Sequence, residues 1–264
     1  MTNYQQLTQA LVEITKPVSL FIRNHREQVS KSDIELKDFN SLVSYVDKTA
    51  EEMLVTGLKE LVPEAGFIAE EGTETQRGQR FNWIIDPLDG TTNFLHGIPI
   101  FAISVALMED KELVCGMVWE IGQNECFTAW KNGGAFLNGK AIQVNSNHEL
   151  KNTLLATGFP YYDFDRKQSF LNLLSSFFEK TRGVRRLGSA ATDLAYVACG
   201  RFDAFFEYGL SPWDVAAGAL LVKEAGGEVT DYSGTNDYLF GREIAAGSKS
   251  IFEPFLAEIQ AHMH

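Results

Sequence analysis

Apolar residues recur at intervals of three and four from Tyr4 to Phe21, near the start of the chain. This spacing is typical of an amphipathic helix, because such positions fall on one face of a 3.6-residue turn. A second helix is expected from about Ser44 to Leu61, ending before Pro63. From Phe67 onward the pattern changes to short β-rich runs, so sheet is predicted to follow the helices.

The β-rich runs predict a series of strands punctuated by glycine and asparagine. The predicted strands are Gly66 to Glu70, Phe81 to Ile85, Ile100 to Met108, Leu113 to Trp119 and Glu125 to Trp130. The segment Lys131-Asn132-Gly133-Gly134 predicts a hairpin turn, since asparagine and glycine tolerate the positive φ angles of such turns.

After about residue 150 strands and helices alternate. The predicted strands lie near Thr153–Thr157, Gly183–Leu187 and Ala204–Glu207, and the predicted helices near Arg166–Glu179, Ala190–Cys199 and Val215–Ala225. This alternation favours α/β layering. No linker rich in proline, serine or charge separates the two halves, about 1–150 (α+β) and 151–264 (α/β). We therefore expect one domain of mixed α/β (α+β) class, with the functional site in the crevice between the layers.

Composition narrows the class of protein. The chain has 264 residues, of which 45% are hydrophobic, so it can bury a large core. It carries 23 Lys+Arg against 35 Asp+Glu, a formal net charge of −12. That charge argues against a general nucleic-acid binder. If the substrate is an anion, a local cation must reverse the sign of the potential at the site.

The number of cysteines and the shortness of the apolar runs indicate in which cellular compartment the protein is found. The three cysteines at 115, 126 and 199 form no C-x-x-C pair and are too few for a disulfide framework, which favours a reducing environment. The N-terminus lacks the features of a secretory signal, and no apolar run approaches the ~18–20 residues that span a bilayer. The protein is expected to be cytoplasmic, without a membrane partner.

The most informative segment runs from Phe81 to Phe94, where an apolar strand leads into Asp86-Pro87-Leu88-Asp89. Pro87 has no N–H and restricts the preceding residue to extended geometry, so the strand is expected to end and the chain to turn where the acids lie. Asp86 and Asp89 can then converge. Two carboxylates and the Leu88 carbonyl suit Mg²⁺, which prefers oxygen ligands.

Gly90 and Thr91 follow the acids at a possible helix start, where exposed N–H groups favour an anion. Metal and phosphate ligands would then lie within a few residues of each other. The alternative interpretation is an ordinary strand-to-turn sequence, with aspartate and glycine chosen for turn geometry.

Two further acidic segments support a metal site. Glu70 closes an apolar run and can enter the cleft beside Asp86, whereas its neighbour Glu71 is expected on the solvated surface. Asp214 stands where a helix should begin, so it is either a first-turn acid favoured by the helix dipole or a ligand that completes a metal cage, and both roles can coexist.

These residues together resemble the inositol monophosphatase family of Mg²⁺-dependent, lithium-sensitive phosphatases. The resemblance rests on the D-P-L-D-G-T segment from Asp86 to Thr91, the W-D-V-A-A-G segment from Trp213 to Gly218, and the upstream Glu70-Glu71. Gly188-Ser189-Ala190-Ala191 and Phe205-Phe206-Glu207 are similar to the inositol-contacting part of that family. The resemblance covers nearly the whole chain and implies an α-β-α-β-α sandwich, usually a homodimer.

The resemblance also implies a role for each matching position. Two or three Mg²⁺ ions would be held by Glu70, Asp86, Asp89, Asp214 and the Leu88 carbonyl. Substrate would contact Asp89, Gly90, Thr91, Ala190, Glu207 and Asp214. Glu70 and Thr91 would activate the attacking water, with Asp47 as the partner of Thr91. The family often has aspartate where Ser41 stands, so a third ion would bind more weakly here.

The expected function is hydrolysis of a small phosphorylated polyol, myo-inositol monophosphate, by metal-activated water. One alternative is a related phosphatase acting on fructose bisphosphate, adenosine bisphosphate, histidinol phosphate or NADP. Another is a non-catalytic protein that uses this fold to contact RNA or the transcription machinery, although the net charge of −12 argues against direct RNA binding. The basic cluster 181–186 is expected at a solvated strand edge or a dimer contact.

Overall fold

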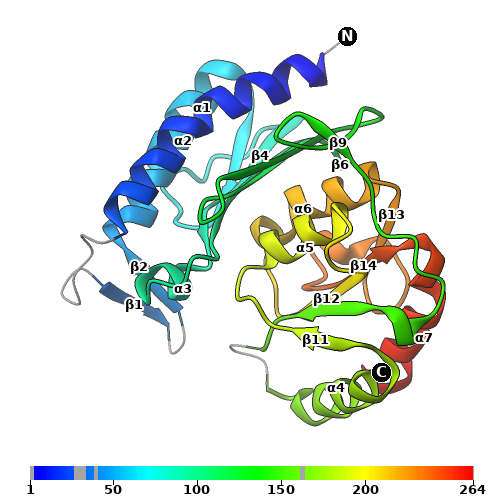
Figure 1. Cartoon of the computed structure of the whole chain (residues 1–264). Helices are drawn as coiled ribbons and strands as arrows, with labels where there is room; N and C mark the ends of the chain where they lie inside the picture. Colours follow the sequence, from blue (N-terminus) through cyan, green and yellow to red (C-terminus); the bar gives the residue numbers. More distant parts are fainter. Residues whose placement is uncertain (1–2, 27–33, 39–40, 161–163, 264) are drawn as a thin grey trace.

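The molecule is built in five layers, α-β-α-β-α, and the computed structural model describes residues 3–26, 34–38, 41–160 and 164–263 (Figure 1). Helices α1 (Tyr4–His25) and α2 (Tyr45–Leu61) cover the outer face of the first sheet, and α5 (Ala190–Ala198) and α6 (Pro212–Glu224) lie between the two sheets. Helices α4 (Lys167–Lys180) and α7 (Lys249–Met263) cover the second sheet. The fold that the resemblance implies is therefore confirmed.

Both N-terminal helices form where the hydrophobic spacing predicts them. In α1 the apolar stripe of Leu11, Val18 and Ile22 is at most 1% exposed and packs against α2 and the sheet. Helix α2 begins with a capping box in which the side chain of Ser44 and that of Asp47, three residues later, satisfy each other's free backbone N–H groups. Asp47 is thereby fixed in the first turn of α2.

The first sheet has seven strands among the described residues. Their order is β3 (Gly66–Ala69), β4 (Phe81–Asp89), β5 (Ala102–Glu109), β6 (Glu112–Glu120), β7 (Glu125–Trp130), β8 (Gly134–Leu137) and β9 (Lys140–Ile142). Strands β3 and β4 are parallel and all other pairs are antiparallel. The predicted hairpin turn is confirmed between β7 and β8, where Asn132 and Gly134 take φ angles of 60° and 85°.

The second sheet has five strands in the described part of the chain. Their order is β11 (Gly183–Arg185), β10 (Leu154–Thr157), β12 (Ala204–Tyr208), β14 (Glu243–Ser248) and β13 (Gly227–Thr230). The remaining elements are the hairpin of β1 (Ile34–Asp38) and β2 (Ser41–Ser44), the short helix α3 (Thr91–Leu95), and the 3₁₀ turns η2 (Leu150–Asn152) and η3 (Asp237–Leu239). None of the helices in these described ranges is long and apolar enough to span a membrane.

Strand β4 corrects one expectation, because Pro87 does not end it. Asp86 pairs with Ser104 of β5 and Asp89 pairs with Ala102, so two residues of β4 lie opposite the single residue between those partners. This bulge accommodates a proline, which cannot donate to the ladder. In a regular strand residues three apart point to opposite faces. The extra residue changes that alternation, so both acids can reach one site.

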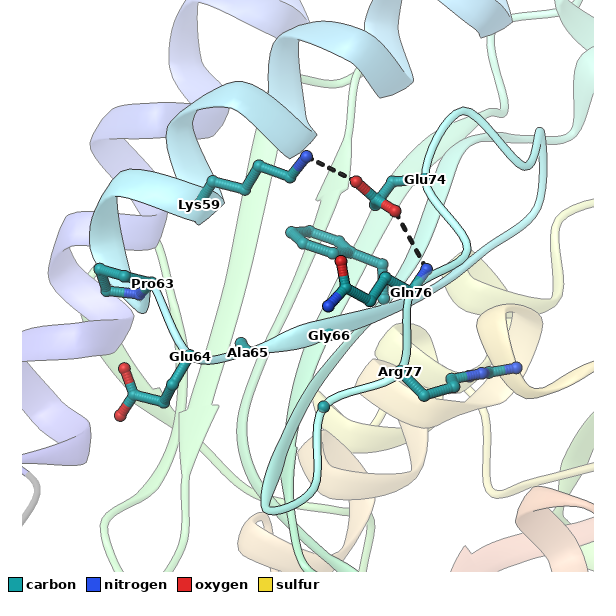
Figure 2. Close-up of a pocket in the computed structure, with 10 residues that line it drawn as sticks. Lys59, Pro63, Glu64, Ala65, Gly66, Glu74, Gln76 and Arg77 are labelled. Carbon is teal, nitrogen blue, oxygen red and sulfur yellow. Dashed lines mark hydrogen bonds and ion pairs between the residues drawn. The ribbon is translucent and has the colours of Figure 1, made fainter.

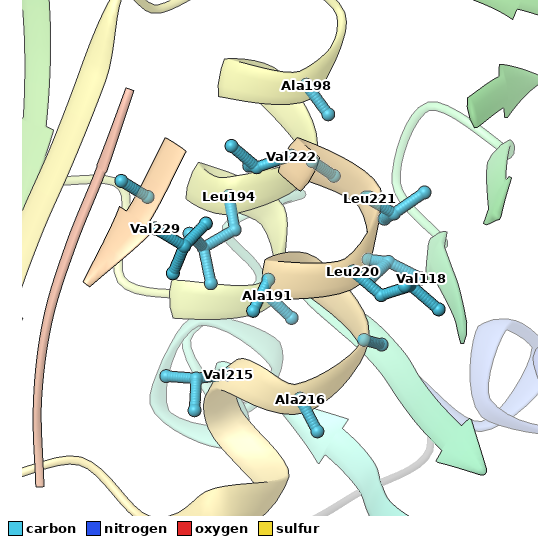
Figure 3. Packing of buried hydrophobic residues seen from close by; sticks show 14 of the residues in the cluster. Val118, Ala191, Leu194, Ala198, Val215, Ala216, Leu220, Leu221, Val222 and Val229 are labelled. Carbon is cyan, nitrogen blue, oxygen red and sulfur yellow. The ribbon is translucent and has the colours of Figure 1, made fainter. Parts of the chain in front are cut away.

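The middle layer holds the two sheets together. Residues 215–222 of α6 are all buried, and a Cβ on Gly218 would lie 2.5 Å from the Cβ of Leu194 in α5. Figure 3 shows apolar side chains from both helices, among them Leu194, Leu220 and Val222, packed into this centre with Val118 of β6. Glycine therefore permits the close approach of α5 and α6 in the core.

Candidate metal centre

Three aspartates from distant parts of the chain meet at one point. Asp86 and Asp89 come from the end of β4 and Asp214 from the first turn of α6. One carboxylate oxygen from each residue lies within 4.8 Å of the others. The predicted convergence of these acids is therefore present in the structure.

Hydrogen bonds across the layers bring Asp214 to the end of β4. Ser104, the strand partner of Asp86, donates its hydroxyl to the carbonyl oxygen of Trp213 at 3.0 Å. Asp214 Oδ2 accepts from the backbone N–H of Ser211 at 2.6 Å, as the acid of a capping box that begins α6. Asp214 thus caps its helix and faces the other aspartates at the same time.

Asp89 links the first sheet to α5. Its Oδ2 accepts from the Ser189 hydroxyl and from the backbone N–H of Ala191, both at 2.7 Å. Ser189 is the N-cap of α5, and the predicted substrate contact Ala190 lies between these two donors. Asp86 is fixed locally, since its Oδ1 accepts from the Leu88 N–H at 2.9 Å.

The charge of Glu70 acts on the same cluster. Burial raises the pKa of Asp86 well above its ordinary value, and the negative charge of Glu70 is the next largest cause, followed by those of Asp89 and Asp214. The pKa of Asp214 is also raised well above its usual range by burial, then by Asp89 and Glu70. Burial raises the pKa of Asp89 to about 6, against hydrogen bonds from Ser189 and Ala191 that lower it.

The donor set fits a hard divalent cation. Carboxylates held this close repel one another, and burial disfavours their charged forms. A cation bound among them would offset both costs, and Mg²⁺ is the ion that prefers a few carboxylates plus substrate phosphate. Asp86, Asp89 and Asp214, with Glu70 beside them, are the residues that could hold it.

Asp47 and Thr91, predicted as partners, are hydrogen bonded to each other. The Thr91 hydroxyl lies 2.9 Å from Asp47 Oδ1 and 3.0 Å from the Leu88 carbonyl oxygen. The second oxygen of Asp47 accepts from the N–H and the hydroxyl of Ser44 at 2.9 and 2.7 Å. Burial raises the pKa of Asp47, while the bonds from Ser44 and Thr91 oppose that change.

Gly90 lies where the backbones of two segments meet. Its φ of 93° is left-handed, and a Cβ there would lie 3.1 Å from the carbonyl oxygens of Gly188 and Ile100. Any side chain would be strained at this position. Glycine is thus required between the acids of β4 and the start of α3.

Glu207, the predicted inositol contact, lies on β12 near the aspartates. It is 6% exposed, and burial raises its pKa, with the charges of Asp214 and Asp89 adding to the effect. A Cβ on Gly158 would lie 1.9 Å from Glu207 Oε1, so only glycine leaves room for this carboxylate.

Two residues near the site are not predicted as site residues by the sequence patterns. Arg186 directly follows β11, the edge strand of the second sheet, where its basic cluster was expected; it is half-buried, and its charge lowers the pKa of Asp89, Asp193 and Glu207. Asp193 is a 1% exposed acid of α5 whose pKa is raised well above its usual range by burial and then by Glu207. The sequence signal that could have indicated Asp193 is an acid within the mostly apolar segment of α5.

Two other expectations concern the periphery of the site. Glu71 is half-buried instead of fully solvated, because its N–H is bonded to Glu51 of α2. Ser41 begins β2, but its side chain and residues 39–40 fall outside the described residues. The expected weakening of a third metal site therefore stays a prediction.

Comparison with known proteins agrees with this geometry. The family model described as the inositol monophosphatase family matches residues 3–264. The chain is 43% identical over 242 residues to Nus factor SuhB of Pseudomonas aeruginosa, covering 90% of this chain and 89% of that one. It is 41% identical over 234 residues to the inositol-1-monophosphatase of Mesorhizobium japonicum, covering 88% of each.

A solved structure has the same architecture. The extragenic suppressor protein suhB from Bartonella henselae matches with a TM-score of 0.91 at 37% identity, covering 96% of this chain and 97% of that one. The chain therefore belongs to the inositol monophosphatase family.

Proposed function

We propose that the protein is a Mg²⁺-dependent phosphomonoesterase that hydrolyses myo-inositol monophosphate to inositol and phosphate. The observation that carries this proposal is the convergence of Asp86, Asp89 and Asp214 within 4.8 Å, in a chain of the inositol monophosphatase family. The net charge of −12 repels an anionic substrate, so cations at this cluster would supply the attraction that the rest of the surface lacks.

The proposed metal ligands are Glu70, Asp86, Asp89, Asp214 and the carbonyl oxygen of Leu88, for two or three Mg²⁺ ions. When bound, Mg²⁺ supplies a water of lowered pKa and neutralises charge on the phosphate and on the departing alkoxide. The protein contributes the geometry. Burial and hydrogen bonds hold the acids in place before the ion arrives.

Thr91 is proposed to orient the attacking water. Because its hydroxyl proton is donated toward Asp47 or the Leu88 carbonyl, the lone pairs of Thr91 Oγ1 remain to accept a hydrogen bond from that water. Asp47 acts as the orienting partner, and the capping box of α2 prevents it from turning away. Glu70 is the proposed acceptor of the water's proton.

The remaining predicted contacts define two ends of the substrate site. Gly90 and Thr91 are proposed to contact the phosphate. Asp89, Asp214, Ala190 and Glu207 are proposed to contact the inositol, where a carboxylate such as Glu207 can accept hydrogen bonds from ring hydroxyls. The positive charge of Arg186 beside Glu207 and Asp89 favours their ionised forms.

Phosphate release from a panel of substrates tests this function. Inositol 1-phosphate, fructose bisphosphate, adenosine bisphosphate, histidinol phosphate and NADP would be compared with and without Mg²⁺. We expect release to require Mg²⁺, to be fastest with inositol 1-phosphate, and to be inhibited by lithium. A faster rate with another substrate would assign the protein to a related branch, and no release from any of them would refute the phosphatase proposal.

A pair of variants tests whether the cluster carries the activity. Asp89→Asn should abolish Mg²⁺-dependent phosphate release while leaving the fold intact. Asp110→Asn is the matched control, because Asp110 is an exposed turn residue with a φ of 56°, which asparagine also tolerates. Near-normal turnover in Asp89→Asn would show that the metal site is assigned wrongly.

The names of several relatives favour a second candidate function. The relatives from Pseudomonas aeruginosa and Escherichia coli are named Nus factor SuhB. The second candidate is therefore a binding role that does not need catalysis. If cells lacking this protein are restored fully by Asp89→Asn, binding is the role that matters there; if only the wild type restores them, it is catalysis.

The family resemblance also supports proposals about the assembled protein. These are a single domain over residues 1–264, a homodimer and a cytoplasmic location. Light scattering coupled to size-exclusion chromatography would measure the mass, with a dimer expected. Fractionation of the producing cells would test the location.

A further inference from the structure

Glu51 is a fully buried carboxylate that the proposed chemistry does not use. It lies in α2 one turn after Asp47 and is 0% exposed. Residues four apart occupy the same face of a helix, so α2 presents both acids to the interior beside the site. A buried charge is costly unless hydrogen bonds satisfy it, so its partners indicate why it is there.

Both oxygens of Glu51 are used by the loop that follows β3. Oε2 accepts from the backbone N–H of Glu71 at 2.8 Å. Oε1 accepts from the N–H and the hydroxyl of Thr73, each at 2.8 Å. Three donors from a three-residue stretch therefore converge on one side chain, and this stretch begins directly after Glu70.

A second tie joins the same loop to α2, but in a more exposed place. Figure 2 shows Lys59 reaching toward Glu74 in the wall of a pocket. Lys59 Nζ lies 2.5 Å from Glu74 Oε2, and the pocket has a volume of about 300 Å³. The Lys59 side chain is 52% exposed, and an ion pair that is so accessible to water stabilises a structure only weakly. The three hydrogen bonds to the buried Glu51 side chain are thus the stronger restraint on the loop.

The restraint acts on both sides of Glu70. On one side its own N–H donates to the Ile85 carbonyl at 3.2 Å, and on the other the next N–H donates to Glu51. These two hydrogen bonds fix the backbone directly before and after the Glu70 side chain, and so set the direction in which that side chain leaves the loop.

We infer that Glu51 is a positioning residue that holds Glu70 at the metal centre. The inference rests on the proposed function, since it takes Glu70 as a ligand of Mg²⁺. Outer partners of metal ligands typically change metal affinity 10–100-fold when they are replaced. Glu51 would act in this way through the backbone of the loop, without touching the ion or the substrate.

Isothermal titration of the metal-free protein with Mg²⁺ tests the inference. Glu51→Gln keeps the size of the side chain but replaces one acceptor oxygen with an NH₂ group that faces the loop donors. We expect its Kd for Mg²⁺ to rise about 10–100-fold and amide exchange at residues 71–73 to become faster. Glu52→Gln is the matched control, because Glu52 is the exposed neighbour on α2 and should leave both measurements unchanged.

A second, milder variant tests the same inference in case Glu51→Gln does not fold. Thr73→Ala, at an exposed loop position, removes only the hydroxyl donor to Glu51 and should raise the Kd about two- to tenfold, the scale of one hydrogen bond. Thr75→Ala, in the same loop, is its control, since the N–H of Thr75 bonds to Glu74 instead.

The outcomes separate this inference from the proposed function. If the wild type binds Mg²⁺ and the Kd is unchanged in Glu51→Gln, or in Thr73→Ala where the first variant does not fold, Glu51 has only a structural role and the inference is wrong. If the wild type binds no Mg²⁺, the proposed function and the inference both fail.

Discussion

At the scale of single residues, the acids of the site carry charges that their surroundings disfavour. Asp89 shows this most clearly, because burial raises its pKa to about 6 although two hydrogen bonds favour the ionised form. An acid with a raised pKa in the folded state binds more protons there than in the unfolded chain. Near neutral pH the metal-free protein therefore carries a buried negative charge on Asp89 that destabilises the folded state.

This charge predicts how the stability of the metal-free protein depends on pH. Between the ordinary pKa of an aspartate, about 4, and the value of about 6 for Asp89, the folded state holds the extra proton, so the free energy of unfolding falls as pH rises. In EDTA we expect the protein to be more stable at pH 5 than at pH 7, with about 1–2 kcal/mol of the difference arising from Asp89.

Urea unfolding at the two pH values would measure this effect. Asp89→Asn should lose part of the pH dependence, whereas Asp110→Asn at an exposed turn should keep it. Acids whose pKa is lowered, such as Glu109, are mostly ionised in both states over this range, so they oppose the trend only weakly. A metal-free protein that gains stability from pH 5 to pH 7 would contradict the argument.

At the scale of elements, the close packing of α5 against α6 places Asp214. A Cβ on Gly218 would lie 2.5 Å from the Cβ of Leu194, an atom close to the backbone that cannot swing aside. Overpacking in a core costs about 1–3 kcal/mol, which exceeds the gain of up to about 1 kcal/mol from replacing a helical glycine by alanine.

Gly218→Ala is therefore expected to lower the free energy of unfolding by about 1–2 kcal/mol. The displaced helix carries Asp214, so Mg²⁺ affinity should fall as well. Urea unfolding and Mg²⁺ titration on the same variant would check both effects. A variant as stable as the wild type would mean that α5 and α6 can separate without cost.

The elements that could be predicted from the sequence are those with a clear hydrophobic period or with glycine, asparagine or proline at their ends. The helices at Tyr4–His25 and Tyr45–Leu61 show an apolar stripe because one face is covered by the sheet and the other meets solvent. The sequence patterns did not predict β13, β14 and α7. Strand β13 has only four residues, β14 is rich in small residues, and α7 contains Pro254, so each signal is weak.

The candidate site was predictable where its chemistry is local. Asp86 and Asp89 stand together in the sequence, and proline and glycine beside them mark a special backbone. The expected end of the strand at Pro87 was wrong, because the register of β4 against β5 decides whether a bulge forms. Arg186 and Glu51 were beyond reach, since their roles depend on partners brought near only by the fold.

At the scale of the whole molecule, the proposed metal ligands come from the first sheet and from α6 in the layer between the sheets, and the proposed inositol contact Glu207 comes from the second sheet. Metal binding should therefore stabilise the entire fold, because only the folded chain presents the site. At Mg²⁺ concentrations about 100 times the Kd, the gain is about 2.7 kcal/mol. For a chain of this size that corresponds to a rise in Tm of about 5–10 °C relative to the protein in EDTA.

Differential scanning calorimetry with Mg²⁺ and with EDTA would measure this shift. Asp89→Asn should lose most of it, because the remaining acids hold the ion less well. A Tm that is the same in Mg²⁺ and in EDTA would count against a resident cation at the cluster.

The bonds from Ser189 and Ala191 to Asp89 cross the boundary between the first sheet and the layer of α5 and α6. The candidate metal site is thus formed where two parts of the fold meet, and its geometry depends on how those parts dock. A substitution far from every ligand that alters this docking would appear in kinetic assays as a catalytic defect. Screens for inactive variants of this protein should therefore recover assembly mutations as well as chemical ones.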